Sequence, residues 1–328
     1  MESLPKVSFV ICTLNCRDYT IRCLKSMRAQ NYPQDKIEII VVDSYSTDGT
    51  IEAAESLGAR VILTKKGGNA EGKGGPKAIG CEATTGEVII TVDSDNALVG
   101  PEWLNNMLHP LLTNPAVNVV ISRMLVCPED PLINQYCSLI GTDSFAAYCS
   151  MDAQLSLQHL PLTDQGRYET YNNTADHFMI CGGYYLTMRR STIESVGGFT
   201  RDADTIFTLA REGRALVAIP KDTYIHHLIT TGFWSFIKKK VKWSHYYFTH
   251  PDPDRTRQWA QAPSDRRRFL WQVIRTLILI PTLWETLVML RKDGRRAWWL
   301  HAPVSFFTTG AYIIGFVKSK TWGRPVAQ

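Results

Sequence analysis

The chain has 328 residues, with 36 Lys and Arg against 31 Asp and Glu, a formal net charge of +5. At 45% hydrophobic and 20% charged residues, the composition excludes a disordered chain and a protein of many membrane spans. Eight cysteines without a Cys-x-x-Cys pair argue against structural zinc. Together with the absence of a signal-peptide pattern, they predict free thiols in the cytosol.

Strand and helix patterns alternate along the first hundred residues. The expected strands are 7–12, 37–42, 60–63 and 88–92, and the expected helices are 17–29, 48–57 and 77–84. This alternation predicts an α/β fold with a mostly parallel central sheet and right-handed crossovers.

The alternation continues less regularly after residue 100. The expected helices are 101–111, one from Ser191 to Gly197, and 204–211, and the expected strands are 117–126, 179–188 and 215–219. Glycines interrupt the strand at 179–188, where the backbone can approach a ligand closely. Residues 128–171 have no clear period, and we assign no element there.

Polar side chains follow each of the first four expected strands. They are Thr13 and Asn15 after the first, Asp43 after the second, Lys65 and Lys66 after the third, and Asp93 and Asp95 after the fourth. Because the carboxyl ends of parallel strands meet at one edge of the sheet, we expect a ligand crevice there.

Asp93 and Asp95 stand one residue apart, directly after a β-branched strand. Two carboxylates at this point suit a Mg²⁺ or Mn²⁺ ion that also holds a diphosphate. The alternative for an isolated Asp-x-Asp is an acidic turn that closes the strand.

A glycine-rich loop at 67–75 follows the third strand and contains Lys73, with Lys77 just beyond it. It nearly matches a P-loop, but Gly74 stands where Ser or Thr must reach Mg²⁺, so we reject that interpretation. The lack of G-x-G-x-x-G after the first strand also disfavours a dinucleotide site. Lys73 and Lys77 can still lie against phosphates or a sugar. A flexible surface loop is the alternative.

Several other side chains are candidates for chemistry. Asp43 can bind ribose hydroxyls or a base N–H, whereas Asp48 is expected to cap the next helix. Asp202 and Asp204 lie at a loop-to-helix junction, where one can cap the helix and the other can deprotonate an acceptor hydroxyl. The His pair ending at His227 is expected beyond the last strand and its loop. An imidazole there can complete a metal shell, although such pairs are usually structural.

Four motifs, in this order, resemble those of the family 2 glycosyltransferases. They are Ser-Phe-Val-Ile-Cys-Thr-Leu-Asn at 8–15, Val-Val-Asp-Ser-Tyr-Ser-Thr-Asp-Gly-Thr at 41–50, Gly-Lys-Gly at 72–74 and Thr-Gly-Glu-Val-Ile-Ile-Thr-Val-Asp-Ser-Asp at 85–95. Gly-Gly-Phe at 197–199 with Asp202, and then Arg-Glu-Gly at 211–213, extend the resemblance to about residues 6–228.

The resemblance implies a GT-A fold and an inverting, metal-dependent transfer from a nucleotide-sugar. By this resemblance, Thr13, Asn15 and Asp43 would hold the nucleoside, and Asp93 and Asp95 the ribose and the metal–diphosphate. We therefore expect a nucleotide-sugar-binding half at 1–100, an acceptor-binding half at 101–232 and a membrane-associated helical region at 233–328.

By the same resemblance, Asp202 would be the general base. Arg201 stands where the family often has Glu, so Asp204 is a second candidate for the base. Ser44 and Tyr45 replace the common Asp-Gly, so nucleoside contacts are expected to differ. The Gln-x-x-Arg-Trp signature of processive synthases is absent, which predicts one sugar added per encounter.

Charge is concentrated near the end of the chain. From Trp234 onward, 17 basic residues against 5 acidic ones give +12, and the preceding residues, with 19 against 26, give −7. Such a tail predicts a polyanionic partner, either anionic lipid or nucleic acid. Apolar runs at 269–290 and 298–317 lie among the basic clusters and favour lipid over nucleic acid.

Either apolar run is long enough to span a bilayer. Arg275, Pro281 and Glu285 make the first a costly span, and a hairpin of two spans would put 291–296 on the far side, against the positive-inside tendency. We therefore expect interfacial helices on the cytoplasmic face of a membrane, with a single span at 298–317 as the alternative.

The sequence thus predicts a transferase that moves one sugar from a nucleotide-sugar, of UDP type, to a lipid-linked acceptor such as a polyprenyl-diphosphate saccharide. Lys238, Lys239 and Lys240 would meet the acceptor's diphosphate. One alternative is a sugar nucleotidyltransferase, but the required glycine-rich loop is missing at 12–16. The other is a catalytically silent sugar- or lipid-binding membrane scaffold.

Overall fold

The computed structural model describes residues 4–65, 74–141, 161–176, 178, 185–249 and 263–322. The chain divides into two compact units. Unit 1 contains Met1–Leu125 and His159–His227, and unit 2 contains Val126–Gln158 and Leu228–Gln328.

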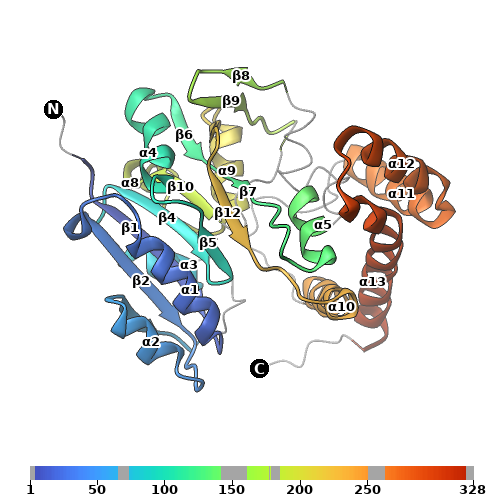
Figure 1. The fold of residues 1–328 in the computed structure, drawn as a ribbon, viewed down its shortest axis with the longest axis horizontal. Helices are drawn as coiled ribbons and strands as arrows, with labels where there is room; N and C mark the ends of the chain where they lie inside the picture. The colour runs from blue at the N-terminus through green and yellow to red at the C-terminus, as the bar shows by residue number, and fades with distance from the viewer. Residues whose placement is uncertain are drawn as a thin grey trace. The chain divides into compact units, whose positions relative to one another are not determined.

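A sheet of nine strands, counted over the described residues, forms the centre of unit 1 (Figure 1). In spatial order the strands are β3 (Arg60–Leu63), β2 (Ile37–Asp43), β1 (Val7–Thr13), β4 (Val88–Asp93), β10 (Tyr185–Arg189), β6 (Val117–Val120), β11 (Leu216–Pro220), β9 (Tyr168–Asn172) and β8 (Thr163–Asp164). Seven of them run in one direction, and β9 and β10 run in the other. The predicted α/β class with a mostly parallel central sheet is confirmed.

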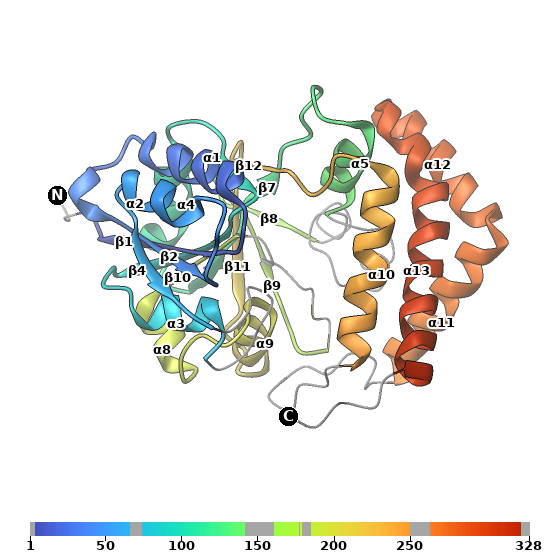
Figure 2. The same cartoon turned by 90° about the horizontal axis from the view of Figure 1, so that it is seen from below.

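Helices cover both faces of this sheet. They are α1 (Arg17–Arg28), α2 (Thr50–Ser56), α3 (Pro76–Glu82), α4 (Trp103–Thr113), α8 (Arg190–Ser195) and α9 (Asp202–Arg211), with a short 3₁₀ turn at Gln34–Lys36. Figure 2 shows α1 and α2 on one face and α3, α8 and α9 on the other. At Gly80 a Cβ atom would lie 2.3 Å from Val10 Cγ1, so glycine lets α3 pack directly on β1.

A second, three-stranded sheet consists of β5 (Asn96–Leu98), β12 (Tyr224–His227) and β7 (Arg123–Met124). It corrects two expectations. The run at 117–126 is not one strand, because the chain leaves the large sheet after Val120 and pairs with β12 from Arg123. His227 lies within a strand rather than beyond one, because residues 224–227 pair with both β5 and β7.

The described part of the strand expected at 179–188 is β10, which runs antiparallel between β4 and β6. Its glycines lie outside the described residues. The helix expected from Asp204 begins at Asp202.

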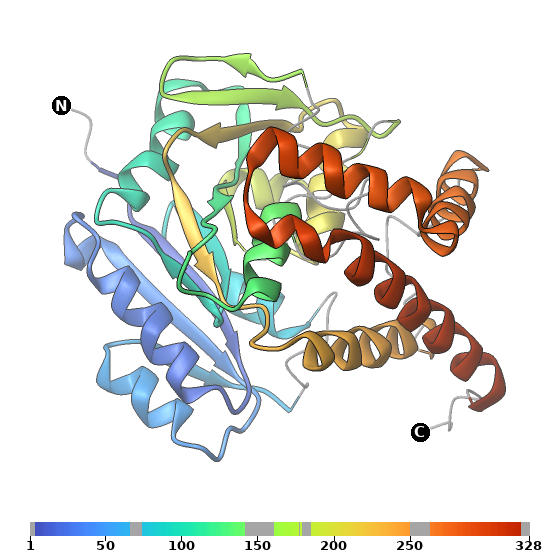
Figure 3. The same cartoon turned by 45° about the vertical axis from the view of Figure 1, so that its right-hand side comes forward.

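All the secondary-structure elements of unit 2 within its described residues are helices. Its elements are α5 (Leu132–Ile140), α10 (Phe233–Thr249), α11 (Pro263–Ile278), α12 (Ile280–Asp293), a 3₁₀ turn at Arg296–Leu300 and α13 (His301–Trp322). Figure 2 and Figure 3 show α13 between α10 on one side and the pair α11 and α12 on the other. Tyr136, Phe236, Trp298 and Val304, each at most 1% exposed, belong to its core.

Candidate active site

The ends of the central parallel strands meet in register. Thr13 on β1 lies opposite Asp43 on β2, and Cys12 lies opposite Asp93 on β4. Asp43 in turn lies opposite Leu63 at the end of β3. The prediction that these polar strand ends share one edge of the sheet is therefore confirmed. Lys65, two residues beyond β3, is exposed, whereas Lys66 and Lys73 lie outside the described residues.

Asp43 is fully buried and organises the loop that follows it. Its Oδ2 accepts hydrogen bonds of 2.6 Å from Thr13 Oγ1 and from Ser46 Oγ, and its Oδ1 accepts one of 2.6 Å from the Ser46 N–H. These bonds satisfy a buried carboxylate and fix residues 44–46 against the end of β1. A direct contact of Asp43 with a nucleoside stays a prediction.

Asn15 closes the same loop from the other side. Its φ of 49° is left-handed, a conformation that asparagine tolerates better than most residues. Its Oδ1 accepts a hydrogen bond of 2.9 Å from the Thr47 N–H, and its own N–H donates to Ser46 Oγ at 2.8 Å. Asp48, the expected helix cap, accepts a bond of 3.1 Å from the first N–H of α2, that of Thr50. Thr13, Asn15 and Asp43 are thus linked through one turn.

Lys77 joins Asp93 to Asp202. Its Nζ lies 2.9 Å from Asp93 Oδ1 and 2.9 Å from Asp202 Oδ2. The other oxygen of Asp202 accepts a hydrogen bond of 3.0 Å from Thr91 Oγ1 on β4. Four side chains from three elements therefore converge, because β4 supplies Thr91 and Asp93 while α3 and α9 each begin beside it.

The charges of this group influence one another strongly. Burial alone would lower the pKa of Lys77, but the carboxylates of Asp202 and Asp93 hold it well above its ordinary value. Burial, together with the nearby carboxylates of Asp95 and Asp202, raises the pKa of Asp93 to about 6 despite the opposing charge of Lys77. Negative charge is in excess here, which favours a bound cation.

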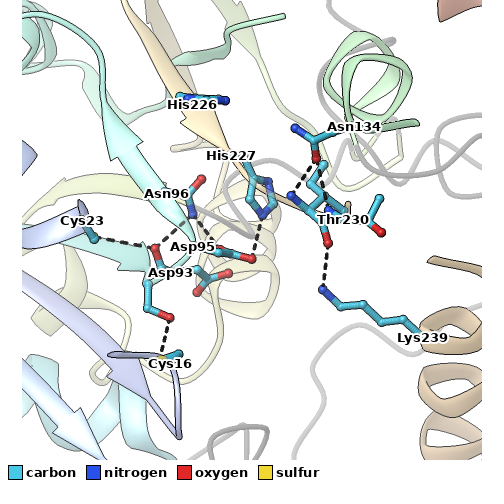
Figure 4. Close-up of polar contacts among 12 residues, drawn as sticks. Cys16, Cys23, Asp93, Asp95, Asn96, Asn134, His226, His227, Thr230 and Lys239 are labelled. Carbon is cyan, nitrogen blue, oxygen red and sulfur yellow. Dashed lines mark hydrogen bonds and ion pairs between the residues drawn. The ribbon is translucent and has the colours of Figure 1, made fainter. Parts of the chain in front are cut away.

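Asp95 and His227 form a second pair beside this group (Figure 4). His227 lies opposite Asn96 in the antiparallel register of β12 and β5, which brings its Nε2 to 3.2 Å from Asp95 Oδ2. Asn96 is buried, and its Nδ2 donates to Asp93 O at 3.2 Å and to Asp95 Oδ1 at 3.4 Å. Arg22 on α1 donates to the carbonyl of His226 at 2.8 Å. The acidic turn is thereby fastened to the strand that carries the imidazole.

Carboxylate oxygens of Asp93 and Asp95 and one imidazole nitrogen make a donor set that suits a divalent cation. The imidazole fits Mn²⁺ better than Mg²⁺, which prefers oxygen ligands. The kinds of donor therefore suit the expected metal, but the three donor atoms do not all lie within 4.8 Å of one another, so the metal site stays a prediction.

Asp204 is placed differently from Asp202. Its Oδ2 lies 2.8 Å from Arg201 Nη1, and both side chains are buried, at 4% and 8% exposed. Neither aspartate is the N-cap residue, because α9 begins at Asp202 and its N-cap is Arg201. The expectation that one of them occupies that position was wrong, and Asp204 is paired with Arg201 instead.

Sequence reasoning missed three contributors to this site: Thr91, Asn96 and Arg22. Thr91 is hidden in a β-branched strand, and Arg22 acts through a backbone carbonyl. No local pattern marks either of them. The sequence predicted that Lys77 lies against phosphates or a sugar. Its pairing with Asp202 could not be predicted, because the two residues are 125 positions apart in the chain.

Comparisons with known proteins agree with this geometry. The model of "Glycosyl transferase family 2" matches residues 8–197. The poly(ribitol-phosphate) beta-N-acetylglucosaminyltransferase TarS of Staphylococcus aureus (strain Mu50 / ATCC 700699) is 31% identical over 95 residues, 28% of this chain and 17% of TarS. Glycosyltransferase AglE of Haloferax volcanii is 31% identical over 98 residues, 29% of this chain and 32% of AglE. The chain thus matches less than a third of the length of either relative.

Among solved structures, the mannosyltransferase PcManGT from Pyrobaculum calidifontis, in complex with GDP-Man and Mn²⁺, has the same fold. The TM-score is 0.57 at 16% identity, covering 98% of this chain and 88% of that one. The fold is accordingly GT-A-like, with C-terminal helices. Because the family model matches more than half of its residues, the chain belongs to glycosyltransferase family 2.

Proposed function

We propose that this protein is an inverting, metal-dependent glycosyltransferase that moves one sugar from a nucleotide-sugar, of UDP type, to a lipid-linked acceptor such as a polyprenyl-diphosphate saccharide. One observation carries the proposal: Lys77 holds Asp93 and Asp202 at 2.9 Å each, at the strand edge where Asp95 meets His227. The residues proposed to bind the metal thus lie next to a separate carboxylate, that of Asp202.

The nucleoside would lie against the turn that Thr13, Asn15 and Asp43 build. This turn stands at the carboxyl edge of β1 and β2, where open α/β sheets bind nucleotides. Lys73 would lie against the phosphates. Asp93, Asp95 and His227 would hold Mn²⁺ or Mg²⁺, which when bound offsets the charge of the departing diphosphate. The complex of PcManGT with GDP-Man and Mn²⁺ supports this arrangement by analogy.

Asp202 would be the general base. The acceptor oxygen bonds to the anomeric carbon from the face opposite the diphosphate. The bond from that carbon to the diphosphate oxygen breaks, its electron pair leaves with the nucleoside diphosphate, and the hydroxyl proton passes to Asp202. Lys77 and Thr91 would keep this carboxylate oriented for the transfer. Asp202 keeps 12% of its side chain exposed, whereas Asp204 is paired with Arg201 in the interior. These facts favour Asp202.

The acceptor would be met by residues 233–328 at the cytoplasmic face of a membrane. On α10, Lys239 lies over the ring of Trp243 at 5.5 Å and Lys240 over that of Phe236 at 5.1 Å. Lys239 also donates to the Ile229 carbonyl at 3.4 Å (Figure 4). Ammonium groups held beside aromatic rings suit a diphosphate attached to an apolar chain. Within the described residues, one helix, Arg296–Ser319, is long and apolar enough to cross a membrane, with a mean hydropathy of 1.3.

The decisive experiment measures release of nucleoside diphosphate from a panel of UDP- and GDP-sugars with Mn²⁺, with and without a polyprenyl-diphosphate acceptor. We expect hydrolysis of one donor by the wild type and its loss in Asp95→Ala. Ala at Lys238, Lys239 and Lys240 together should reduce transfer to the lipid acceptor and spare donor hydrolysis. A protein that neither binds nor hydrolyses any donor would be a scaffold, and equal loss of both activities in the lysine variant would refute the acceptor role.

A further inference from the structure

Helices α11 and α12 have their polarity reversed relative to a water-soluble protein. Between residues 270 and 290 every exposed residue is apolar: Leu270, Trp271, Ile274, Leu277, Ile278, Ile280, Leu283, Trp284 and Leu287. Ile280, Trp271 and Trp284 are 71%, 63% and 64% exposed. Their most buried residues are polar, since Gln272, Thr276, Thr282 and Thr286 are each at most 2% exposed. A helix that contacts water on its outer face has the opposite arrangement.

The polar interior of these helices is bonded within the protein. Arg275 on α11 is paired with Glu285 on α12. The second oxygen of Glu285 lies 3.2 Å from His301 Nε2, and His301 Nδ1 lies 2.8 Å from the hydroxyl of Tyr136. Charged residues at membrane depth face the protein interior and pair with one another, as Arg275 and Glu285 do. The pairing also lowers the free-energy cost of placing the charges of Arg275 and Glu285 at membrane depth.

Helix α13 shows the same reversal. Ser305, Thr308 and Thr309 are fully buried, whereas Phe306, Phe307 and Ile314 are 37–47% exposed. A core helix of a soluble protein can be equally apolar, but it buries its large apolar side chains and exposes its polar ones. Helix α13 also packs closely on α10, because a Cβ atom at Gly315 would lie 1.9 Å from Ser244 Oγ. Small residues at helix contacts are common in membranes.

The geometry of α11 and α12 excludes a straight span. The axes of Leu270–Ile278 and Ile280–Asp293 differ by 81°, with the break at Leu279, whose φ is 64°. At about 1.5 Å per residue, the two segments are roughly 14 and 21 Å long, less than the ~30 Å hydrocarbon core. The apex of the bend carries Ile278 and Ile280, both more than half exposed. The bent pair is thus an apolar wedge with its tip at the break.

Basic residues lie at the opposite ends of the wedge. Arg267 is exposed near the start of α11, and Arg291, Lys292, Arg295 and Arg296 are exposed at the end of α12 and just beyond it. Such a distribution matches a bilayer with anionic headgroups, because charge at both ends can stay in the headgroup layer while the apolar tip enters the acyl chains.

We propose that α11 and α12 enter one leaflet of an anionic bilayer as a re-entrant wedge, tip first, with both basic ends on the same side of the membrane. The wedge rests on the membrane association that belongs to the proposed function, and it specifies how the protein would bind the membrane. The expected interfacial helices would thus be an inserted, bent pair.

The test uses the full chain and sealed vesicles of phosphatidylcholine with 30% phosphatidylglycerol. The wild type should float with the vesicles at 0.15 M NaCl and stay bound at 1 M, since insertion is not screened by salt. The double variant Ile278→Glu with Ile280→Glu should bind at least tenfold less. A matched control is Leu63→Glu with Leu112→Glu, because these leucines of unit 1 are 49% and 50% exposed. The control should bind like the wild type.

Two further measurements separate insertion from other arrangements. Brominated lipids should quench tryptophan fluorescence, and the quenching should fall in Trp271→Phe with Trp284→Phe. In the variant Arg267→Cys with Arg295→Cys, a membrane-impermeant maleimide added outside the vesicles should label both new thiols, identified by peptide mass spectrometry.

Release of the protein from vesicles at 1 M salt would overturn the wedge in favour of surface adsorption. Protection of one of the two thiols from the maleimide would overturn it in favour of a membrane span. Dimers in the absence of lipid that the apex substitutions abolish would overturn it in favour of an interface between copies. Donor hydrolysis in detergent is measured on the same proteins. Its absence from the wild type would contradict the glycosyltransferase proposal and leave the wedge standing.

Discussion

The Nε2 atom of His227 lies 3.2 Å from Asp95 Oδ2, on two antiparallel strands whose register sets His227 opposite Asn96. The strand pairing determines this distance, because β5 begins directly after the Asp-x-Asp turn and β12 pairs with it. An imidazole is thereby added to an acidic pair that would otherwise offer oxygen ligands.

Replacing His227 by Ala should weaken Mn²⁺ binding by about 10- to 100-fold, the loss typical of disturbed metal shells. Mn²⁺ titrations of donor hydrolysis and of thermal stability measure the effect. The matched control is His109→Ala, a half-buried histidine on α4, a helix that contributes no residue to the site. Equal loss of Mn²⁺ affinity in the two variants would show that the effect is not specific to His227.

The sequence predicted this edge of the sheet well for a simple reason. Runs of β-branched residues identify parallel strands that are covered on both faces, and a run ends where the chain turns polar. Thr13, Asp43 and Asp93 therefore lie where they were expected. The register of parallel neighbours then aligns them without any further information.

The other features of the fold and the site depend on contacts between distant residues, which no local sequence pattern shows. Residues 117–126 are mostly apolar, and the polar pair Ser122 and Arg123 at the break between β6 and β7 does not by itself distinguish the end of a strand from exposed positions within one. The ion pair between Arg201 and Asp204 in the first turn of α9 joins two side chains that the sequence pattern does not pair. The reversed polarity of α11 and α12 becomes visible only when the buried face is known.

Asp202 and Asp204 should respond differently to replacement by Asn. Asp202→Asn should lower kcat about 10²- to 10⁴-fold with donor affinity retained, because only proton transfer is removed. Asp204→Asn removes one charge of a buried ion pair, which costs about 3 kcal/mol of unfolding free energy. The folded fraction of that variant should keep its kcat. Single-turnover transfer and thermal unfolding, measured on both, distinguish the two roles. A large kcat loss confined to Asp204→Asn would make Asp204 the base.

Lys77→Met tests the link between the metal group and the base. Without the ammonium, Asp93 and Asp202 repel each other, and Asp202 keeps only its bond from Thr91. We expect kcat to fall at least tenfold, since small displacements of a reacting group are costly. Apparent Mn²⁺ affinity should not fall, because the site has lost a competing positive charge.

Lys25→Met is the matched control for Lys77→Met, since Lys25 is an exposed lysine in the last turn of α1 and not at a strand end. It should leave both kcat and Mn²⁺ affinity unchanged. Unchanged kcat in Lys77→Met would mean that Lys77 does not orient the base.

Asp293 provides a pH-dependent contribution to the stability of unit 2. Its carboxylate accepts hydrogen bonds from Arg295 Nε, at 2.7 and 2.8 Å, and from the indole N–H of the buried Trp298. Partial burial alone would raise the pKa of Asp293, but these hydrogen bonds outweigh it and hold the pKa below its usual value. The carboxylate therefore contributes stability that is complete above the unfolded pKa of about 3.9 and is lost as the pH falls through the lower folded value.

Asp293→Asn should accordingly lower the free energy of unfolding by about 1–2 kcal/mol at pH 7, because charge-assisted hydrogen bonds are lost. The difference from the wild type should shrink as the pH falls below about 4, because the carboxylate takes up a proton in the unfolded chain first and in the folded protein at lower pH. Thermal unfolding in detergent between pH 3 and pH 7 measures it. Asp18→Asn, whose side chain is 92% exposed beside Arg17, should show little change at any pH. A destabilisation by Asp293→Asn that is the same at pH 3 and pH 7 would contradict the role of the carboxylate charge and assign the effect to side-chain packing at Trp298.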